Sequence, residues 1–449
     1  MVGMANKIAP TAILGEGGRD SPTRGGADIL AIGFGVSLVQ WAIGFFCRLP
    51  GAGVPSPILL ALFLVCWAMA GYIAGNLTHR GWKAGLLTSL VSATINLLVL
   101  GSFLGGDDPN QIVPSALIWI PGSYFAAMLL GSVGAWFGSL TAKPGPCPNW
   151  TATFSVVAAA ATFLLIAVGG LVTSKEAGLA VTDWPNSFGY NMFLYPLSRM
   201  TGGVYYEHSH RLLGALVGLT TVVLALHLFV VDDRRWLKAL AVIAIMAVIV
   251  QGVMGGLRVT GSPTLSEAVE DMSPNLALAV VHGVFAQIFL GLMAAIAVFC
   301  STGWRTGTPV EKIPPRSTDI VLTSLFVPLL LVQITVGALQ RHYEIGLLAH
   351  VSLAAPVAFA AIGVGMRAWG VYPEQTQLRR FGLVLIWATG AQVLLGFGAL
   401  IATTGMMEID DLSLSAILIA TAHQATGAVL LATSVGLALW VRRKTVNSS

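Results

Sequence analysis

Long apolar stretches dominate this chain, and they set the expected fold. A run of about 20 apolar residues is long enough to cross a hydrocarbon core of about 30 Å. We identify twelve such runs, near residues 29–46, 57–76, 84–104, 115–140, 152–173, 209–231, 236–257, 275–300, 318–340, 346–366, 380–403 and 414–441. Strand-like alternation of polar and apolar residues is absent, which disfavours a β-barrel. The pattern therefore predicts an all-α integral membrane protein with about twelve transmembrane helices.

The composition agrees with that class. Of the 449 residues, 55% are hydrophobic and 10% are charged, and the mean hydropathy is +0.80. Soluble domains carry about 25% charged residues. The four cysteines are scattered and form no CxxC pair, so we expect no structural disulfide. The first 28 residues are polar and glycine-rich and lack the apolar core of a signal peptide, which predicts a disordered cytoplasmic tail over residues 1–28.

The distribution of cations predicts the orientation of the chain in the membrane. If both termini are cytoplasmic, 18 of the 24 Lys and Arg fall on the cytoplasmic side. The six on the outer side are Arg48, Lys175, Arg199, Arg211, Arg258 and Arg341. This asymmetry follows the positive-inside rule and predicts a multi-pass protein of the cell membrane. The net charge of +4 therefore reflects topology and gives no indication of nucleic-acid binding.

The last two thirds of the chain contain an internal repeat. The segment VGGLVTSKEAGLA (168–180) aligns with VGALQRHYEIGLL (336–348). Further along, QGVMGGL from Gln251 aligns with QVLLGFG from Gln392, and the spacing between the two copies is shorter there. The difference in spacing predicts a longer outer loop in the first copy, near residues 174–206.

The repeat divides the chain into four predicted segments. The tail is followed by a four-helix membrane extension of unknown role over residues 29–148, which ends in a proline-rich segment. A first four-helix bundle follows over residues 149–304 and a second over residues 305–449. Ligand sites of membrane proteins often lie at repeated units, so we expect the function in this pseudo-repeated eight-helix core.

Four of the eight histidines follow the repeat. The shorter spacing, which separates Gln251 from Gln392, also separates His282 from His423 and, to within one position, His210 from His350. All four histidines lie in the outer half of helices that run inward from the outer face, where ionisable residues are costly and usually functional. The alternative is that each imidazole makes an ordinary interhelical hydrogen bond. Repeated pairs on one side of the membrane favour ligand sites.

The other four histidines follow no such pattern. We expect His79 at the cytoplasmic surface, His227 in a hydrogen bond between helices without a repeat partner, and His342 in an outer turn. His208 should point away from His210, because two residues of an α-helix rotate by about 200°.

Each histidine pair could hold one of several groups. Two imidazoles from neighbouring helices, with glycines making room, suit a heme iron between two axial nitrogens. Zinc would require further Cys, His or carboxylate ligands near each pair, and none recurs in both copies. A proton pathway could use histidines but does not explain the duplicated pairs. We favour two bis-histidine heme sites, with iron ligated by His210 and His282 in one and by His350 and His423 in the other.

Only the first pair has an acid beside it. Glu207 lies one turn before His210 on the same helix face, and the second copy has Leu347 at the corresponding position. A carboxylate near the iron can move protons or stabilise a developing cation, although the macrodipole also favours an acid at a helix start. Three outer cations could pair with heme propionates or with lipid headgroups: Arg211, Arg258 and Arg341.

Together these residues resemble the heme A synthase family. The Glu-x-x-His-Arg signature of that family is met by Glu207, His210 and Arg211 within YYEHSHRLLG, and its outer-loop pattern ahead of Asp-Trp-Pro by AGLAVTDWPNSFGYN (177–191). Three further segments are similar to its helix-end and last-helix motifs: QGVMGGLRVTG (251–261), VQITVGALQRH (332–342) and TAHQATGAVLLATS (421–434). The similarity covers roughly residues 152–441.

The resemblance implies an enzyme with two different heme sites. The substrate heme O would bind near His210 and His282, heme b would lie between His350 and His423, and Glu207 would be the catalytic carboxylate. The implied reaction oxidises a methyl group of heme O to a formyl group by successive hydroxylations and gives heme A for terminal oxidases. The implied partners are heme O synthase, the cytochrome c oxidase assembly machinery and an electron donor that the sequence does not identify. The sequence also leaves a homo-oligomer open.

Two features depart from the family pattern. Many members carry a cysteine pair in the long outer loop, and residues 174–206 contain none. Residues 29–148 lie outside the family core. Two other functions stay open at this point. One is a diheme b-type electron-transfer protein without porphyrin chemistry, against which the asymmetry at Glu207 argues. The other is a twelve-helix transporter, which would place ionisable residues near the bilayer midplane.

Overall fold

The computed structural model describes residues 24–78, 80–143, 145–262, 272–305, 317–404 and 413–445. Their regular structure is helical, apart from two isolated β-bridges. Twelve of the described helices are long and apolar enough to cross a membrane. The prediction of an all-α multi-pass membrane protein is therefore confirmed.

The long helices closely follow the apolar runs. They are α1 (Ala27–Cys47), α2 (Ser56–Leu77), α3 (Trp82–Leu104), α4 (Ala116–Leu140), α5 (Trp150–Ser174), α6 (Gly202–Val231), α7 (Arg235–Thr260), α8 (Leu276–Cys300), α10 (Ser317–Tyr343), α11 (Leu347–Gly370), α12 (Thr376–Thr404) and α13 (Leu414–Thr445). The short elements are η1 (Arg24–Gly26), η2 (Leu197–Arg199) and α9 (Thr302–Arg305). The largest boundary difference is at α6, which begins at Gly202 rather than near residue 209 and so includes the whole EHSHR motif.

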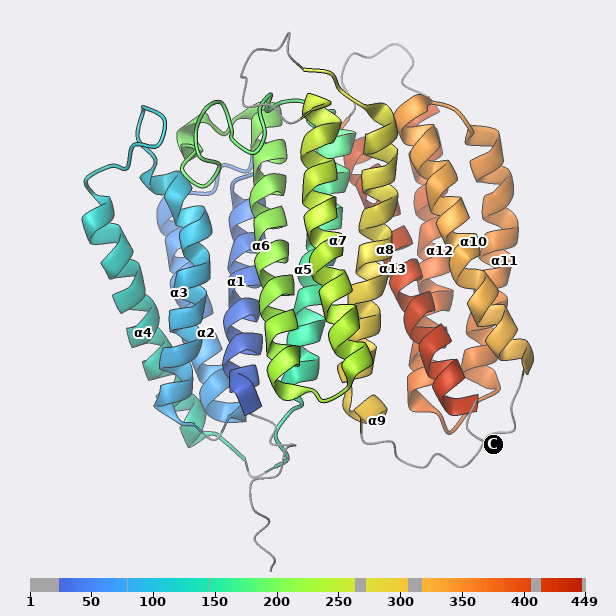
Figure 1. The fold of residues 1–449 in the computed structure, drawn as a ribbon, viewed down its shortest axis with the longest axis horizontal. Coiled ribbons are helices and arrows are strands. Elements are labelled where there is room, and N and C mark those ends of the chain that lie inside the picture. Colours follow the sequence, from blue (N-terminus) through green and yellow to red (C-terminus); the bar gives the residue numbers. More distant parts are fainter. Residues whose placement is uncertain are drawn as a thin grey trace, which may run out of the picture.

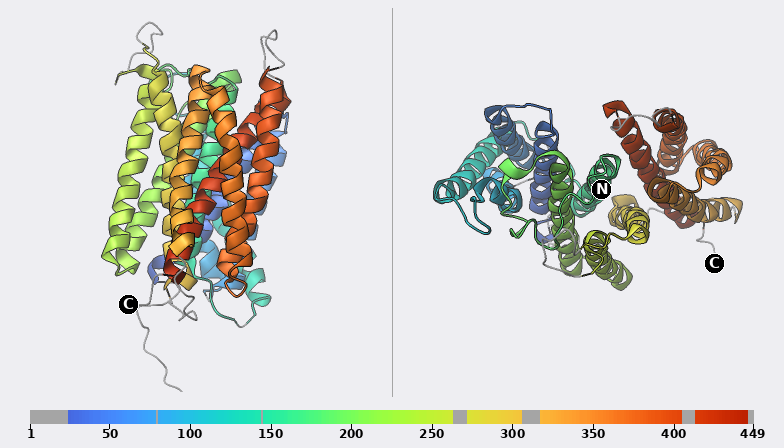
Figure 2. Two further views of the ribbon diagram at one scale, coloured as in Figure 1. Left: turned by 90° about the vertical axis from the view of Figure 1, so that its right-hand side faces the viewer. Right: turned by 90° about the horizontal axis from the view of Figure 1, so that it is seen from above.

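The helices form three groups side by side (Figures 1 and 2), with α1–α4 in one, α5–α8 in the next and α10–α13 in the last. The upper end of Figure 1 is the end that the charge pattern assigns to the outer side. The first and second bundles meet through α8 and α13, and α13 also packs on α5 while α10 packs on α8. The predicted boundaries of one extension and two bundles stay a prediction.

The extension shares a hydrophobic core with the first bundle. Phe34 of α1 and Phe154 of α5 have ring centroids 5.2 Å apart, and α1 also packs on α6. The second bundle has a separate core of its own, around residues such as Phe326 and Leu385. Residues 29–148 are thus continuous with one bundle rather than with both.

Close helix contacts within the extension depend on glycine. A Cβ atom added to Gly71 of α2 would lie 2.1 Å from the carbonyl oxygen of Gly131 in α4, and one added to Gly75 would lie 2.0 Å from that of Ala135. Small residues let transmembrane helices approach closely where burial from water cannot drive association. A polar network adds to this packing, because the buried Gln40 side chain accepts from Ser92 and Asn96 and donates to a carbonyl of α2.

The start of the described chain corrects the predicted tail. Residues 24–28 form η1 and the first residues of α1, and residues 1–23 lie outside the described residues. Asp28 is fully buried and forms an ion pair with Arg80 at 2.8 Å. A buried carboxylate requires such a partner, so this pair fixes the beginning of α1.

Candidate functional site

The four repeated histidines all lie toward the upper ends of their helices, on α6, α8, α11 and α13. In each bundle the two helices that carry them have the same two neighbours, so they face each other diagonally across the bundle. Each ring packs against a glycine, where an added Cβ would lie 2.9 to 3.0 Å from the imidazole Cε1. The pairs are Gly169 with His210, Gly255 with His282, Gly337 with His350, and Gly396 with His423. A side chain at these glycines would therefore displace the histidine rings.

The second histidine pair has the separation that a shared metal ion requires. The ring centroids of His350 and His423 are 6.3 Å apart, and the rings are inclined at 81°. Two imidazoles bound on opposite faces of one metal ion, at about 2.0 Å each, place their ring centroids about 6 Å apart. The Nδ1 of His423 also lies 3.2 Å from the carbonyl oxygen of Gln392. Metal-bound histidines generally donate their other ring N–H to such an acceptor, so the residues fit bis-histidine ligation.

The first histidine pair has unpaired polar atoms. The Nδ1 atoms of His210 and His282 are buried, and neither has a hydrogen-bond partner among the described residues. A buried polar atom without a partner is costly in an apolar environment. Such atoms are expected where a ligand completes the site. The described residues contain no group of three or more His, Cys, Asp or Glu that could hold a metal ion, so a zinc site there would lack the further ligands it needs.

Glu207 and Arg211 lie beside the first pair, Glu207 one turn before His210 and Arg211 directly after it. Glu207 is only 5% exposed, and its Oε1 accepts from the Nε of Arg211 at 3.2 Å. The other Arg211 nitrogens donate to three carbonyl oxygens of the outer loop, those of Val181, Asp183 and Asn186. Four of the five N–H groups of this guanidinium are therefore used within the protein. Arg211 thus joins the carboxylate to the loop.

The long outer loop, residues 175–201, contains site residues that sequence reasoning missed. His208 of α6 is fully buried, and its Nδ1 lies 3.0 Å from the Ser187 hydroxyl. The Tyr195 ring lies 5.0 Å from the His208 ring, and burial raises the pKa of the Tyr195 hydroxyl. The buried Asp183 carboxylate accepts two backbone N–H groups of the turn at 188–189. Because these partners lie in an irregular segment, no sequence period could reveal them.

The N-terminal extension supports this loop from the side. The Tyr190 hydroxyl donates to the carbonyl of Asp107 at 2.5 Å, and Arg199 donates to the same oxygen at 3.0 Å. Cβ atoms added to Gly101 of α3 and to Gly105, directly after that helix, would lie 2.1 and 2.0 Å from loop carbonyl oxygens. Figure 1 shows the loop beside the upper ends of α6 and α3. The extension is therefore in direct contact with the loop that holds Arg211.

The other two predicted cations bind backbone at the same end. Arg258 of α7 donates to the carbonyl of Gly178 in the outer loop at 3.0 Å, and Arg341 of α10 donates to the carbonyl of Thr173 in α5. The Trp184 ring of the loop contacts α7 where Gly256 leaves room for it. The propionate contacts predicted for these arginines stay predictions.

Comparison with known proteins identifies the family of this region. Residues 152–351 match a family model, COX15-CtaA, described as cytochrome oxidase assembly protein. Residues 152–351 belong to the cytochrome oxidase assembly protein family. The matched part runs from α5 into α11 and includes Glu207, His210, His282 and His350. No curated protein and no solved structure matched the chain.

The match of residues 152–351 to this family model confirms the resemblance predicted from the sequence. It associates that region with cytochrome oxidase assembly. His423 and the extension α1–α4 lie outside the residues matched to the family. Their parts in the site therefore rest on the geometry of this chain and on its internal repeat.

His227 lies at the opposite end of α6 from the histidine pairs. His227, near the lower end of α6, lies 3.0 Å from the Thr151 hydroxyl of α5, as the predicted hydrogen bond between helices requires. His227 and Arg367 are as far apart in the sequence as His210 and His350. The position of His227 therefore does have an equivalent in the second copy, but the residue there is an arginine. His342 lies in the last turn of α10, and His79 lies outside the described residues.

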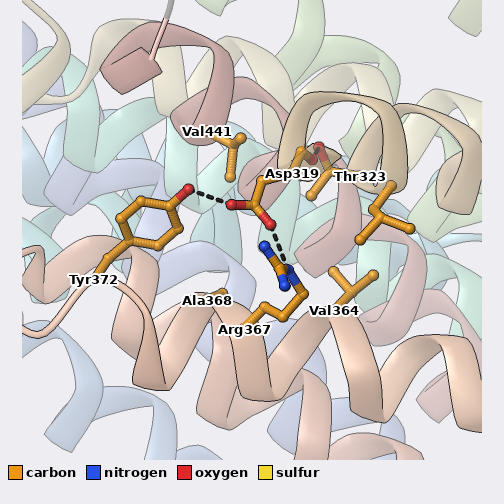
Figure 3. A pocket seen from close by; sticks show the side chains of 8 residues that line it. Asp319, Thr323, Val364, Arg367, Ala368, Tyr372 and Val441 are labelled. Atoms are coloured by element: carbon orange, nitrogen blue, oxygen red, sulfur yellow. Dashed lines mark hydrogen bonds and ion pairs between the residues drawn. The ribbon is translucent and has the colours of Figure 1, made fainter. Parts of the chain in front are cut away.

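Arg367 belongs to a charged cluster at the lower end of the second bundle (Figure 3). Its Nε donates to the buried carboxylate of Asp319 at 2.6 Å, and the Tyr372 hydroxyl donates to the other oxygen of that carboxylate. Arg367 and Tyr372 approach Asp319 from α11 and the turn after it. By the spacings of the repeat, the residues of the first bundle equivalent to Asp319 and Arg367 are Thr151 and His227. In both copies these residues link the first helix of the bundle to the second. The link is a hydrogen bond in the first copy and an ion pair in the second.

Proposed function

We propose that this protein is a heme A synthase, a membrane oxidoreductase that converts a methyl group of heme O into a formyl group. The observation that carries the proposal is the asymmetry of two equivalent histidine pairs. Both sit at the same height in their bundles, and only the first has a buried carboxylate on the adjacent turn. An electron-transfer protein with two hemes has no use for an acid at one of them. The family of residues 152–351 supports the same conclusion.

The two pairs take different partners in this proposal. His350 and His423 hold the iron of heme b, which supplies one-electron transfer when bound. His210 and His282 bind the iron of the substrate heme O. The 6.3 Å separation of the second pair and the unpaired Nδ1 atoms of the first support these assignments.

Glu207 is the residue that acts on protons. Each hydroxylation by dioxygen takes up two electrons and two protons and leaves one of the two oxygen atoms as water, and the twice-hydroxylated carbon loses a further water to give the formyl group. A group that transfers protons is therefore needed close to the substrate. The Glu207 carboxylate lies one turn from His210, and Arg211 orients it through the 3.2 Å hydrogen bond. The loop and the extension keep this carboxylate buried, which strengthens its interactions by excluding water.

The site would work at the outer face of the cell membrane, with both termini in the cytoplasm. The asymmetry of the 24 Lys and Arg supports this orientation. Heme O synthase would deliver the substrate, and the cytochrome c oxidase assembly machinery would receive the product. The electron donor is a separate protein or small molecule that contacts the outer end, and a homo-oligomer is compatible with the apolar outer faces of the helices.

The decisive experiment expresses the protein with a source of heme O and identifies the extracted hemes by chromatography and mass. Heme A is the expected product of the unchanged protein. In Glu207→Ala, heme O or a hydroxylated intermediate should accumulate, and heme A should fall by about 100-fold, within the usual range for a group that transfers a proton.

Glu176→Ala is the matched control, because Glu176 is an exposed acid in the same outer loop. It should leave the yield of heme A unchanged. Normal production of heme A by Glu207→Ala would remove Glu207 from the mechanism. If the unchanged protein holds heme b but makes no heme A, it is a diheme electron-transfer protein, and if it holds no heme at all, a transporter becomes the better hypothesis.

A further inference from the structure

Glutamine accompanies three of the four histidines. Each histidine ring packs against a glycine of a neighbouring helix. In three of the four cases, the residue one helical turn before that glycine is a glutamine: Gln251, Gln333 and Gln392. In the fourth case, on α5, the residue one turn before Gly169 is Leu165. Residues one turn apart lie on the same face of a helix. All four positions are therefore directed toward the same part of their histidines, and only one of them is apolar.

The three glutamines contact their histidines at two points each. The Nε2 of Gln333 donates to the backbone carbonyl of His350 at 3.0 Å and lies 3.2 Å from its Nδ1. The Nε2 of Gln251 donates to the backbone carbonyl of His282 at 3.0 Å and lies 3.4 Å from the Nε2 of the His282 ring.

The contacts of Gln392 with His423 combine backbone and side chain. The backbone carbonyl of Gln392 lies 3.2 Å from the Nδ1 of His423, and its side-chain amide lies 3.4 Å from the Nε2. Gln251 and Gln333 therefore restrain both the helix turn and the ring of their histidines, and Gln392 contacts the ring of His423 at both nitrogens.

His210 lacks this restraint. Leu165 has no hydrogen-bonding group, so it makes no such contact with the ring or the backbone carbonyl of His210. The Nδ1 atoms of His210 and His282 are alike in having no partner within the described part of the chain, so the missing side-chain amide is what sets His210 apart. Two cations lie near His210. Arg211 has four of its N–H groups committed to Glu207 and the outer loop, and Arg258 donates to the carbonyl of Gly178. Partners that fix a metal-bound imidazole typically change metal affinity by about 10- to 100-fold. The bond from His210 to an iron should be weaker than the other three by about that factor.

We infer that Gln251, Gln333 and Gln392 are positioning residues for three axial imidazoles, and that Leu165 makes His210 the exchangeable ligand of the substrate iron. The inference rests on the proposed function, because it assigns His210 to heme O. Release of His210 would leave room for a small neutral ligand such as dioxygen on the side of the substrate where Glu207 lies. His282 keeps the substrate in place, and both ligands of the second site stay bound.

Carbon monoxide tests this inference without reference to turnover. It binds ferrous heme only where an axial position becomes free, so the purified holoprotein is reduced and its difference spectrum with carbon monoxide is recorded. The unchanged protein should bind carbon monoxide at the heme O site and not at the heme b site. Leu165→Gln should lower the affinity at the heme O site by about 10- to 100-fold. Leu164→Gln, which adds the same group one position earlier on α5, should leave it unchanged.

The second site provides the reverse test. Gln333→Leu gives His350 the surroundings of His210, and the heme b site should then bind carbon monoxide. This variant decides the question if Leu165→Gln does not retain its hemes. Equal affinity in Leu165→Gln and the unchanged protein, or no binding at heme b in Gln333→Leu, would overturn the inference. Absence of heme A from the unchanged protein, with carbon monoxide binding as expected, would overturn the proposed function instead.

Discussion

The first and second bundles have the same helices and the same histidine spacing, yet they differ in almost everything around the histidines. The first has a buried acid, an arginine tied to a long loop and the support of four further helices. The second has a short turn between α10 and α11, and its residues equivalent to Glu207 and Arg211 are the exposed Leu347 and Val351. Under the proposed function, the comparison teaches that the histidines hold the hemes and that their surroundings decide at which heme chemistry occurs.

The two bundles also differ in how many of their paired histidines are contacted by a glutamine. In the second bundle both imidazoles have a glutamine, and in the first only His282 has one. A site that only carries electrons gains from fixed ligands, because they do not need to move. A site that admits a reactant needs one ligand that can leave.

Removal of His350 should have the largest effect on this comparison. His350→Ala takes away one of the two imidazoles that lie 6.3 Å apart, so the second site should lose its heme while the first keeps its own. The measurement is the b-type absorption spectrum and the ratio of heme to protein. His342→Ala, at the end of the neighbouring helix α10, is the control and should keep both hemes. An unchanged spectrum in His350→Ala would assign that ligand elsewhere.

Replacement of Arg211 should have the next largest effect and should be confined to the first bundle. Arg211→Lys keeps the charge but cannot make the four hydrogen bonds that join Glu207 to the outer loop. Displacement of a catalytic group by about 1 Å can cost about 100-fold in rate, so heme A output should fall by about that factor. The heme b spectrum should not change. Arg48→Lys, at the same end of α1, is the control, and an equal fall in that variant would mean a general loss of stability.

The smallest effect is expected where the extension contacts the outer loop. Tyr190→Phe removes the hydrogen bond to the Asp107 carbonyl, which is worth about 1 kcal/mol. Amide hydrogen exchange across residues 175–201 should become about 5-fold faster, the factor that this energy gives. Tyr343→Phe, at the exposed upper end of α10, is the matched control. If exchange in the loop does not change, the extension does not support it through this contact.

Most of the fold could be predicted because it repeats one simple signal. Each span is a run of apolar residues long enough for the hydrocarbon core, and the charges between spans gave a consistent count. The start of α1 could not be predicted, because its order depends on the ion pair of Asp28 with Arg80, which lies two helices further along the chain. The start of α6 was placed too late, because the polar residues of EHSHR break the apolar run while remaining helical.

The candidate site was predictable where it repeats. The histidine pairs and the acid were visible in the sequence, because the second copy supplies a comparison for each position. The glutamines were visible in the same way, since Gln251 and Gln392 open the aligned segments. The partners of Arg211 and His208 were not, because they are backbone atoms and loop residues whose positions depend on tertiary contacts. The support from α3 and α4 left no signal for the same reason.

The way the two bundles meet has a consequence for how they came to differ. In the repeat, α5 is equivalent to α10, and α8 is equivalent to α13. The contact of α13 with α5 is therefore equivalent to that of α8 with α10, and the contact of α8 with α13 is equivalent to itself. This is the arrangement of an isologous dimer interface, in which both partners use the same surface. In a dimer of identical polypeptides, any acid gained beside one iron would also appear beside the other. Because a single gene product carries both units here, one unit was free to acquire a reactive carboxylate while the other was not.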